Sequence, residues 1–369
     1  MPSFDMQGMR SIDVLKTAYL TANVLNIEEP AGLLKGLLVD PVSPVFPGTD
    51  SIEFGREQLG REGAPFIPTE AAAVFVGDRT RSMTAMDIPN IAMRKSIHSG
   101  DIAQDRSIGD QIFVNGSAAT TQSNGLAARV DRYQRDMVRR IENTLEWWVS
   151  RMLSDGTVTY SDSNYDAFSY DFGRSADLTV TLTGAAQWDE TTAEPIEDIQ
   201  TIKQLVADKE YLSVNTAICS PEAAAAIRKD LPNKFNARLD NRNLDEFRQT
   251  SYIDVTAPYA QQGAVTPIGR INGIDFWEYN RSVTLFGGSS VPLVDANSIY
   301  FMHVGQGADI RQFYAPVYDM KEAPGRAINT ELYSKSWSVD YPSEMQMMVQ
   351  TRPLVAPFRP DFCAKLICL

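Results

Sequence analysis

The sequence predicts an α+β protein in which one long helix stands between segments of strands. The first observation is an apolar pattern at three- and four-residue steps over residues 126–153, which is typical of a one-sided helix. The second is a switch to two-residue alternation after Gly156, which indicates strands. The third is a succession of helix and strand patterns over about residues 190–325, which indicates a compact α+β or α/β unit.

The composition indicates an ordered globular chain. Its 369 residues are enough for two or three compact units, and 43% of them are apolar, which is ample for a core. There are 47 acidic residues against 34 basic ones, so the formal net charge is −13. The protein as a whole should therefore not be attracted to DNA or to anionic membranes, and any contact with nucleic acid must be local.

The cysteine pattern and the lack of long apolar runs indicate where the protein is located. The cysteines are odd in number and have no metal-type spacing: Cys219, Cys363 and Cys368. If Cys363 and Cys368 share a strand, they face opposite sides with roughly 16 Å of chain between them, which excludes a disulfide between them. No apolar run approaches the roughly 20 residues of a membrane span, and the N-terminus lacks the apolar core of a signal peptide. We therefore expect a cytoplasmic protein.

The first fifty residues predict a helix followed by an extended arm. A short amphipathic helix is expected over residues 11–25, begun by Ser11, because apolar residues recur there at three- and four-residue steps: Ile12, Leu15, Tyr19 and Ala22. Four prolines follow between residues 30 and 47. Because proline removes a helical hydrogen bond and restricts the residue before it, this density predicts an extended arm that lies on another surface.

A long hairpin is predicted next. Residues 52–59 and 72–79 are β-prone and would form its two limbs, with a charged middle that contains glycine and proline as its tip. The segment has little to bury on its own. It is either a flexible surface loop or an arm that adds itself to the surface of a neighbour.

The long helix over residues 126–153 would span about 42 Å. Its apolar face carries Leu126, Val130, Tyr133, Met137, Ile141, Leu145, Trp148 and Met152. Its opposite face carries Arg132, Arg135 and Arg139, followed by Glu142 and Glu146. Such an arginine stripe can hold phosphates, or it can be a solvated face with partial internal pairing. Because Arg135 and Arg139 repel one another, an acidic partner from another subunit is also expected.

Residues 156–160, 167–172 and 177–182 alternate between apolar and polar and predict strands. They include Asp171-Phe172-Gly173, the tripeptide with which protein kinases hold magnesium. A kinase also needs a Gly-rich loop, a strand lysine and a catalytic-loop Asp after His-Arg. The chain does not meet these requirements. Neither His98 nor His303 is followed by Arg-Asp, and the Gly-containing segment at residues 304–309 lacks the third glycine of such a loop. Gly173 is therefore expected to turn the chain at the end of a strand, and Phe172 to pack inside.

The unit over residues 190–325 combines helices with strands. Residues 194–209 predict a helix with Pro195 in its first turn, and a strand over residues 212–219 follows. Ser220 and Pro221 then predict the start of another helix. Asn272-Gly273 predicts a tight hairpin, and the last forty residues return to β-prone runs.

No catalytic constellation is visible in the sequence. Nucleophilic catalysis by serine or cysteine needs a base, and the two histidines are in unremarkable settings. A pair of carboxylates, as in a glycosidase, remains open because acidic residues are plentiful, but nothing singles out such a pair. In a chain of this size, this raises the weight of a structural role.

The order of these elements resembles the major capsid proteins of tailed phages, which share the Hong Kong 97-type fold, and most closely the lambda-type major capsid protein family. Residues 171–200 resemble the family in a Gly-Arg-Ser turn, a polar strand, a Trp and an acidic helix start with proline. Residues 334–369 are similar in a Trp, a Pro-Ser-Glu-Met step into a strand, a Pro-Leu and a closing strand with Pro-Asp. The individual motifs are weak. Their order and spacing, collinear over nearly the whole chain, make the resemblance specific.

The resemblance implies a division of the chain into the parts of that fold. These are an N-arm (1–50), an extended E-loop hairpin (51–93), a P domain with a spine helix and a β-hairpin (94–189, helix 126–153), an α/β A domain (190–325) and C-terminal P-domain strands (326–369). The protein would assemble with copies of itself, as pentamers and hexamers, into the shell of a virion capsid built in the host bacterial cytoplasm. It would be no enzyme and would hold no cofactor or metal.

Charged residues of the E-loop and the spine helix are expected to make inter-subunit contacts: Arg56, Glu57, Arg61, Glu62, Arg79, Arg81, Arg132, Arg135 and Arg139. Gly173 and Arg174 are expected at a structural turn at the edge of the P domain.

Partner proteins are also implied. One subset of the fold locks its shell by an isopeptide bond from an E-loop lysine, but no lysine occurs between Lys35 and Lys95, and arginine cannot be that nucleophile at neutral pH. The resemblance therefore implies a decoration protein at the threefold positions, together with a portal protein. No long charged helical leader precedes residue 11, so we expect a separate scaffold protein. The acidic balance fits a container that contacts packaged DNA only weakly and has no membrane partner.

Two alternatives remain at this point. An encapsulin, a bacterial compartment that stores enzymes, uses the same fold, although encapsulins resemble other branches of it and no feature for docking cargo peptides is seen. The alternative from another class is a hydrolase that uses carboxylates.

Overall fold

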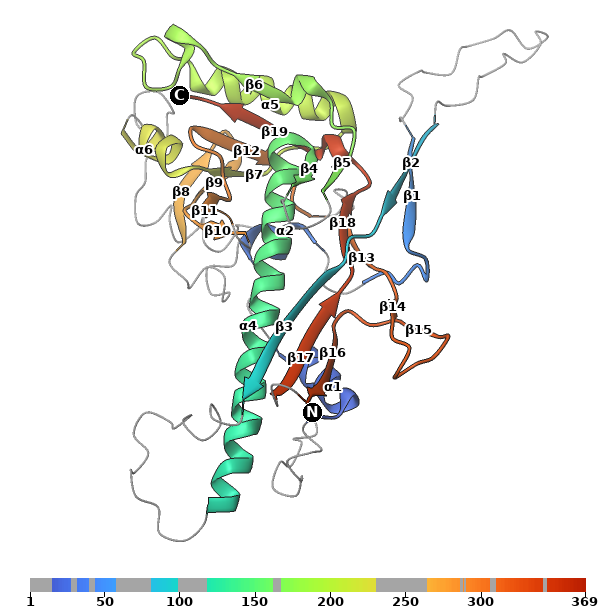
Figure 1. Cartoon of the computed structure of the whole chain (residues 1–369). Helices are drawn as coiled ribbons and strands as arrows, with labels where there is room; N and C mark the ends of the chain where they lie inside the picture. The colour runs from blue at the N-terminus through green and yellow to red at the C-terminus, as the bar shows by residue number, and fades with distance from the viewer. Residues whose placement is uncertain are drawn as a thin grey trace, which may run out of the picture.

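The computed structural model of the chain describes residues 15–27, 32–39, 44–57, 81–98, 118–161, 167–229, 264–285, 288, 290–305, 310–340 and 344–369. It is built around one helix, α4 (Ala118–Asp155), whose 38 residues span about 57 Å. Figure 1 shows α4 running along the molecule, with the largest sheet at its C-terminal end and a smaller sheet beside its other half. The prediction of a long helix over residues 126–153 is confirmed, and the helix begins earlier, at Ala118.

The apolar face of α4 is buried as predicted, with Leu126 and Tyr133 partly buried at its start. Near its C-terminal end the helix is covered on all sides, because Trp147 and Val149 are buried as well as Trp148. The prediction that Glu146 lies on the solvated face is therefore wrong, since its side chain is 0% exposed.

The N-terminal segment contains two short helices. The first, α1 (Thr17–Leu25), begins at Thr17, and the predicted start at Ser11 lies outside the described residues. It buries Leu20 and Val24, whereas Ala22, expected on the apolar face, is exposed.

The second helix, α2 (Leu33–Leu38), replaces part of the predicted extended arm. The sequence Leu-Leu-Lys-Gly-Leu-Leu carries no proline, and Pro30 and Pro41 flank this helix rather than interrupt it. Leu33, Leu34 and Leu38 are buried, and α2 packs against α4. Packing against the long helix thus stabilises a turn and a half that is too short to be stable alone.

A two-stranded arm projects from the body (Figure 1). Its strands β1 (Ser51–Glu57) and β2 (Arg81–Asp87) pair antiparallel, with Ser51 opposite Asp87 and Glu57 opposite Arg81. The first predicted limb is confirmed. The limb predicted over residues 72–79 lies outside the described residues, and β1 pairs with residues 81–87 instead.

The base of this arm is tied to the body. The Tyr170 hydroxyl donates a hydrogen bond to the Asp87 carbonyl oxygen at 2.5 Å, and Arg352 forms an ion pair with Asp50. Met86 and Ile88 are buried in the main core. The anchored end of the arm is therefore the end that contains Ser51 and Asp87.

The largest sheet has six strands in the order β6-β19-β12-β7-β9-β8. Its strands are β6 (Thr179–Thr181), β19 (Cys363–Ile367), β12 (Ser298–Met302), β7 (Thr216–Cys219), β9 (Ile274–Tyr279) and β8 (Val265–Ile271). The predicted turn joins β8 to β9, with φ of 49° at Asn272 and 79° at Gly273. Strands β6 and β19 lie outside residues 190–325 in sequence, so this sheet crosses both boundaries expected for the A domain.

The six-stranded sheet lies between two cores. On one face, residues such as Ile218, Trp277 and Tyr300 join the core of α4. On the other face, the sheet packs against α5 (Pro195–Glu210) and α6 (Pro221–Lys229) through Ile199, Ile202, Val206 and Ile227. Cys363 belongs to the first core and Cys368 to the second, so the two thiols face opposite sides as predicted, and all three cysteines are free and buried.

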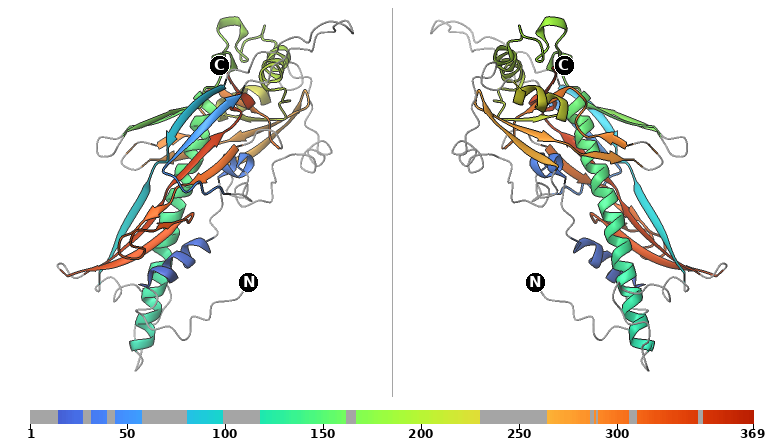
Figure 2. Two further views of the ribbon diagram at one scale, coloured as in Figure 1. Left: turned by 90° about the vertical axis from the view of Figure 1, so that its right-hand side faces the viewer. Right: turned by 90° about the vertical axis from the view of Figure 1, so that its left-hand side faces the viewer.

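Beside the other half of α4 lies a three-stranded sheet, β16-β17-β3, made of β16 (Tyr333–Val339), β17 (Glu344–Thr351) and β3 (Ile91–His98). Figure 2 shows this sheet along one side of the helix, with α1 close to it. Smaller pairs complete the fold: β4 (Thr157–Tyr160) with β5 (Phe168–Asp171), β10 (Ser282–Thr284) with β11 (Ser290–Pro292), β13 (Ile310–Tyr314) with β18 (Pro353–Pro357), and β14 (Val317–Tyr318) with β15 (Ala327–Ile328).

Candidate functional site

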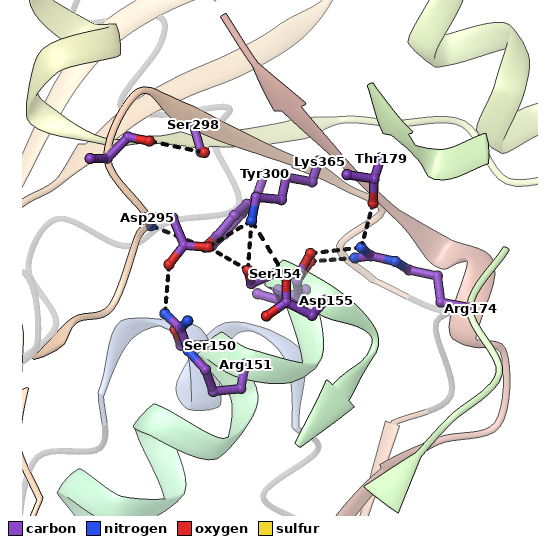
Figure 3. Close-up of polar contacts among 12 residues, drawn as sticks. Ser150, Arg151, Ser154, Asp155, Arg174, Thr179, Asp295, Ser298, Tyr300 and Lys365 are labelled. Atoms are coloured by element: carbon purple, nitrogen blue, oxygen red, sulfur yellow. Dashed lines mark hydrogen bonds and ion pairs between the residues drawn. The ribbon is translucent and has the colours of Figure 1, made fainter. Parts of the chain in front are cut away.

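Arg174 caps the C-terminal end of α4. Its Nη1 donates to the Leu153 carbonyl oxygen at 2.5 Å, and its Nη2 donates to the Ser154 carbonyl oxygen at 2.6 Å and to Thr179 Oγ1 at 2.8 Å (Figure 3). The last carbonyl oxygens of a helix lack partners within the helix and carry its negative dipole end, so a guanidinium is favourable there. Arg174 thus joins the end of the long helix to the edge strand of the six-stranded sheet.

Gly173 makes the turn that places Arg174 at the end of α4. Its φ is 73°, in the left-handed region that favours glycine, and its N–H donates to Asp171 Oδ1 at 2.8 Å. Phe172 is partly buried against the main core, and Ser175 N–H donates to Asp361 Oδ1 at 2.7 Å. The chain therefore turns at Gly173, and Asp171 accepts the hydrogen bond that closes this turn.

A buried ion network lies one turn earlier on α4 (Figure 3). Lys365 on β19 is 8% exposed, and its Nζ lies 2.7 Å from Asp295 Oδ2 and 2.8 Å from Ser154 Oγ. Arg151 Nη2 donates to the other Asp295 oxygen at 2.8 Å. Asp295 is thus held from both sides, by a cation on the sheet and by a cation on the helix.

The protonation of this network follows from those contacts. Burial opposes ionisation of Asp295, but hydrogen bonds from Lys365 and Ser154 and the charge of Arg151 hold its pKa well below the usual 3.8. Burial and the nearby Asp295 charge raise the pKa of Tyr300, whose hydroxyl oxygen accepts a hydrogen bond from the Asp295 backbone N–H at 3.1 Å. The network therefore stays charged on Asp295 and neutral on Tyr300 near pH 7.

Glu146 forms a second junction, farther toward the middle of α4. Its carboxylate accepts hydrogen bonds from the backbone N–H groups of Leu34 and Lys35 and from the Tyr279 hydroxyl, each at 2.9 Å. Three separate segments of the chain therefore meet at one carboxylate: α2, α4 and the end of β9. Lys35 Nζ adds an ion pair with Glu142 at 2.7 Å.

Burial dominates the electrostatics of this junction. It raises the pKa of Glu146 above its usual value of 4.5, while the hydrogen bonds from Lys35, Leu34 and Tyr279 act in the opposite direction. Burial and the adjacent Glu146 raise the pKa of the Tyr279 hydroxyl as well. Tyr279 therefore remains a hydrogen-bond donor.

The arginine stripe of α4 is exposed where the sequence predicted it. Arg132, Arg135 and Arg139 are all exposed. Arg135 Nε lies 2.9 Å from Asp131 Oδ2, one turn earlier on the same helix, so part of the charge is paired internally. Such an exposed pair is worth about 0.3–0.5 kcal/mol, which is too little to prevent another partner from replacing it. Contacts of these arginines with another subunit stay a prediction.

The structure describes three of the six charged residues that were predicted to make contacts from the E-loop. Arg56 and Glu57 lie in β1 and Arg81 lies in β2, at the end of the arm away from its anchored base. Glu57 and Arg81 stand directly opposite one another in the register. Arg61, Glu62 and Arg79 lie outside the described residues.

Within the described ranges, no group of three or more His, Cys, Asp or Glu side chains could hold a metal ion. No helix in the described part of the chain is long and apolar enough to cross a membrane.

Two residues of these junctions could have been found from the sequence. Glu146 stands within Leu-Glu-Trp-Trp-Val, a run too apolar for a helix with one exposed face. Lys365 likewise stands alone within the apolar strand Phe-Cys-Ala-Lys-Leu-Ile-Cys-Leu. A single charge within such a run indicates a buried charged group that is held by hydrogen bonds or by an opposite charge. Asp295 gives no comparable signal, because it lies in a loop between short strands.

Comparison with known proteins agrees with this geometry. The family model of Phage major capsid protein E matches residues 16–368. No curated protein matches the chain. The chain is similar to the crystal structure of a protein assigned as a prophage capsid protein of Escherichia coli CFT073, at 14% sequence identity and a TM-score of 0.64, over 96% of this chain and 99% of that one.

Two further solved structures align less closely. One is a phage-related protein from Bordetella bronchiseptica RB50, at 13% identity and a TM-score of 0.47, over 95% of this chain and 97% of that one. The other is from the capsid of the cyanophage P-SCSP1u, at 11% identity and a TM-score of 0.49, over 93% and 89%.

The family match spans nearly the whole chain, and the first structural likeness confirms the predicted Hong Kong 97-type fold. Assembly from copies of the chain follows from its membership. This chain belongs to the phage major capsid protein E family and is a phage shell-forming protein.

Proposed function

We propose that copies of this chain, as pentamers and hexamers, form the icosahedral shell that encloses the double-stranded DNA genome of a tailed phage. The observation that carries the proposal is the β1–β2 arm. Its base is fixed to the body by Asp50 and Asp87, while its two strands extend away as a separate two-stranded sheet (Figure 1). An isolated two-stranded hairpin is marginally stable in water, so a neighbouring copy is its natural support.

The parts of the fold take roles in this proposal. Residues 1–50 act as the N-arm, residues 51–93 as the E-loop and α4 as the spine of the P domain. The A domain is formed around the six-stranded sheet, so it includes β6 and β19 in addition to residues 190–325. The proposal thus keeps the predicted order of parts and moves two strands across its boundaries.

Partners follow from the same reasoning. The absence of lysine between Lys35 and Lys95 leaves the E-loop without an amine for an isopeptide bond, so a decoration protein at the threefold positions would reinforce the shell. A portal protein and a separate scaffold protein complete the set, and assembly takes place in the host bacterial cytoplasm. The acidic chain would contact packaged DNA only weakly. In this role the protein is structural and catalyses no reaction.

Electron microscopy of particles from the native source tests the proposal. DNA-filled shells with one portal vertex are expected. Enzyme-filled shells would instead indicate a storage compartment, and a soluble protein with hydrolase activity and no shells would contradict the proposal. A denaturing gel of the same particles should show single chains, whereas a ladder of covalent oligomers would contradict the inference about the E-loop.

The arm itself is tested by replacing Arg56, Glu57, Arg61 and Glu62 together by alanine. Shell yield or shell thermal stability should fall, because the four charges are expected to pair with the adjacent subunit. The matched control replaces two exposed charges of α6, Glu222 and Lys229, by alanine. If the quadruple variant forms shells with the wild-type yield and melting temperature, these four charges have no role in assembly.

A further inference from the structure

A second hairpin displays apolar side chains to solvent. It is formed by β14 and β15, and Figure 1 shows it projecting away from α4. Tyr318 is 59% exposed and Met320 is 83% exposed. Five large hydrophobic residues are exposed in the described part of the chain, and two of them lie here, two positions apart: Leu25, Phe46, Tyr211, Tyr318 and Met320. Tyrosine and methionine are enriched at protein interfaces, so this pair indicates a contact surface.

Asp319, between the two exposed residues, holds the hairpin in place. Its carboxylate is buried, forms an ion pair with Lys335 on β16 and accepts a hydrogen bond from the Tyr333 hydroxyl at 2.9 Å. It also accepts the backbone N–H groups of Lys321 at 2.9 Å and Glu322 at 3.4 Å, which closes the turn. Asp319 stands between Tyr318 and Met320 in the chain, so its anchoring fixes the positions of both neighbours, which are exposed.

The turn that follows carries two cations and one exposed carboxylate, Glu322. Lys321 and Arg326 are exposed, and within the residues that the structure describes neither forms an ion pair with a carboxylate. The chain as a whole carries a net charge of −13. Two unpaired cations beside two apolar side chains therefore fit an acidic surface with an apolar patch, and each copy of this chain supplies abundant acidic surface.

We propose that the tip of this hairpin, residues 318–326, binds a second copy of the chain in the assembled shell. Tyr318 and Met320 are the apolar anchors, Lys321 and Arg326 face carboxylates of the neighbour, and Asp319 is the positioning residue. Anchoring before binding reduces the conformational entropy that is lost when the contact forms, which favours a small but rigid anchor. The inference rests on the shell-forming function and adds a contact outside the E-loop and the arginine stripe.

Photocrosslinking tests the contact. A benzophenone amino acid replaces Tyr318 in a minority of chains, which are mixed with wild-type chains so that shell formation depends on the wild type. After irradiation of purified shells, a denaturing gel should show a covalent product with the mass of two chains. Irradiation of unassembled subunits at the same concentration should give no such product. No product in shells, or a product with a different virion protein, would overturn the proposal.

Substitutions give a second measurement that does not depend on the probe. Tyr318→Ser together with Met320→Ser should raise the protein concentration needed for assembly at least several-fold while leaving the melting temperature of the unassembled chain unchanged. The matched control is Tyr211→Ser, because Tyr211 is 58% exposed and lies on the A-domain side of the molecule. Assembly of the double variant at the wild-type concentration would contradict the hairpin contact. Failure of wild-type shells to form would contradict the shell function instead, so the two outcomes are distinct.

Discussion

Glu146 on α4 lies so close to Gly32 that a Cβ atom on Gly32 would be 2.0 Å from the Glu146 carboxyl carbon. The same carboxylate accepts the N–H groups of Leu34 and Lys35, which are the first donors of α2. A helix of six residues therefore begins on a side chain that stands 112 positions later in the sequence. This contact fixes the N-terminal segment against the centre of the molecule.

Gly32→Ala should destabilise the fold by about 1–3 kcal/mol, because the added methyl group forces a buried carboxylate and two hydrogen bonds to shift. Chemical denaturation gives the free energy of unfolding, and hydrogen exchange should show faster exchange across residues 33–38. The matched control is Gly288→Ala, whose Cβ would meet its nearest atom at 3.6 Å, an ordinary contact. Equal stability of both variants would show that the segment around Gly32 moves aside freely.

Glu146→Gln should change how stability depends on pH. Burial raises the pKa of Glu146 above 4.5, so the folded chain binds this proton more tightly than the unfolded chain. The stabilisation from this group is fully present below pH 4.5 and is lost as the pH rises through the folded pKa. Relative to Glu146→Gln, the wild type should therefore lose stability as the pH rises above 4.5.

Denaturation curves at several pH values from 4 to 8 measure this difference. Glu142→Gln is the control, because it removes a carboxylate from the same helix where the side chain is partly exposed. Parallel pH profiles for the wild type and Glu146→Gln would mean that the hydrogen bonds from Leu34, Lys35 and Tyr279 fully offset the cost of burial.

Elements with local signals were predictable from the sequence. The apolar period of α4 and the Ser220-Pro221 start of α6 depend on neighbours within a few positions, and Ser220 Oγ indeed accepts the Ala223 N–H at 3.3 Å. By contrast, α2 depends on Glu146 and could not be read from its own six residues. The partner of β1 was also missed, because the second limb ends where Met86 and Ile88 are buried in the main core, which its own sequence does not show.

The site was predictable only as far as its backbone. The turn at Gly173 follows from the strand alternation and from glycine's access to positive φ. The role of Arg174 could not be predicted in this way. Its carbonyl partners, on Leu153 and Ser154, stand about twenty positions earlier in the sequence, and only the tertiary fold brings them next to Arg174. The pairing of Asp295 with Lys365 spans 70 positions and likewise depends on strand order in the sheet.

Substitutions in the Lys365 network should have unequal costs. Asp295→Ala leaves Lys365 and Arg151 without their shared carboxylate and should cost about 3–5 kcal/mol. Lys365→Met keeps the apolar stem and leaves Asp295 paired with Arg151, so it should cost less. The double variant should be more stable than the sum of the two single changes predicts, which a double-mutant cycle measures. Additive costs would show that the two side chains act independently.

The same network should make the protein sensitive to acid. The pKa of Asp295 is held below 3.8, so its contribution is present above that pH and is lost as the pH falls toward the folded pKa. Asp295→Asn should therefore reduce the slope of stability against pH below 4. The control is Asp131→Asn, which removes a carboxylate from the exposed pair with Arg135 on α4.

Arg174→Ala should loosen the C-terminal end of α4. It removes charge-assisted hydrogen bonds to two carbonyl oxygens, each of which contributes about 1.5–3 kcal/mol when the donor is charged, and it leaves those oxygens partly buried. Arg174→Lys should recover only part of the loss, because one ammonium cannot reach both carbonyl oxygens and Thr179 in the geometry of a guanidinium.

Hydrogen exchange of residues 152–157 and the free energy of unfolding are the measurements. Arg140→Ala is the control, since Arg140 is exposed and its ion pair with Asp136, four positions earlier, is worth about 0.3–0.5 kcal/mol. If Arg174→Ala and Arg140→Ala lose equal stability, solvent satisfies the end of the helix and the guanidinium is dispensable. If Arg174→Lys equals the wild type, the positive charge alone is sufficient and the fork geometry is not required.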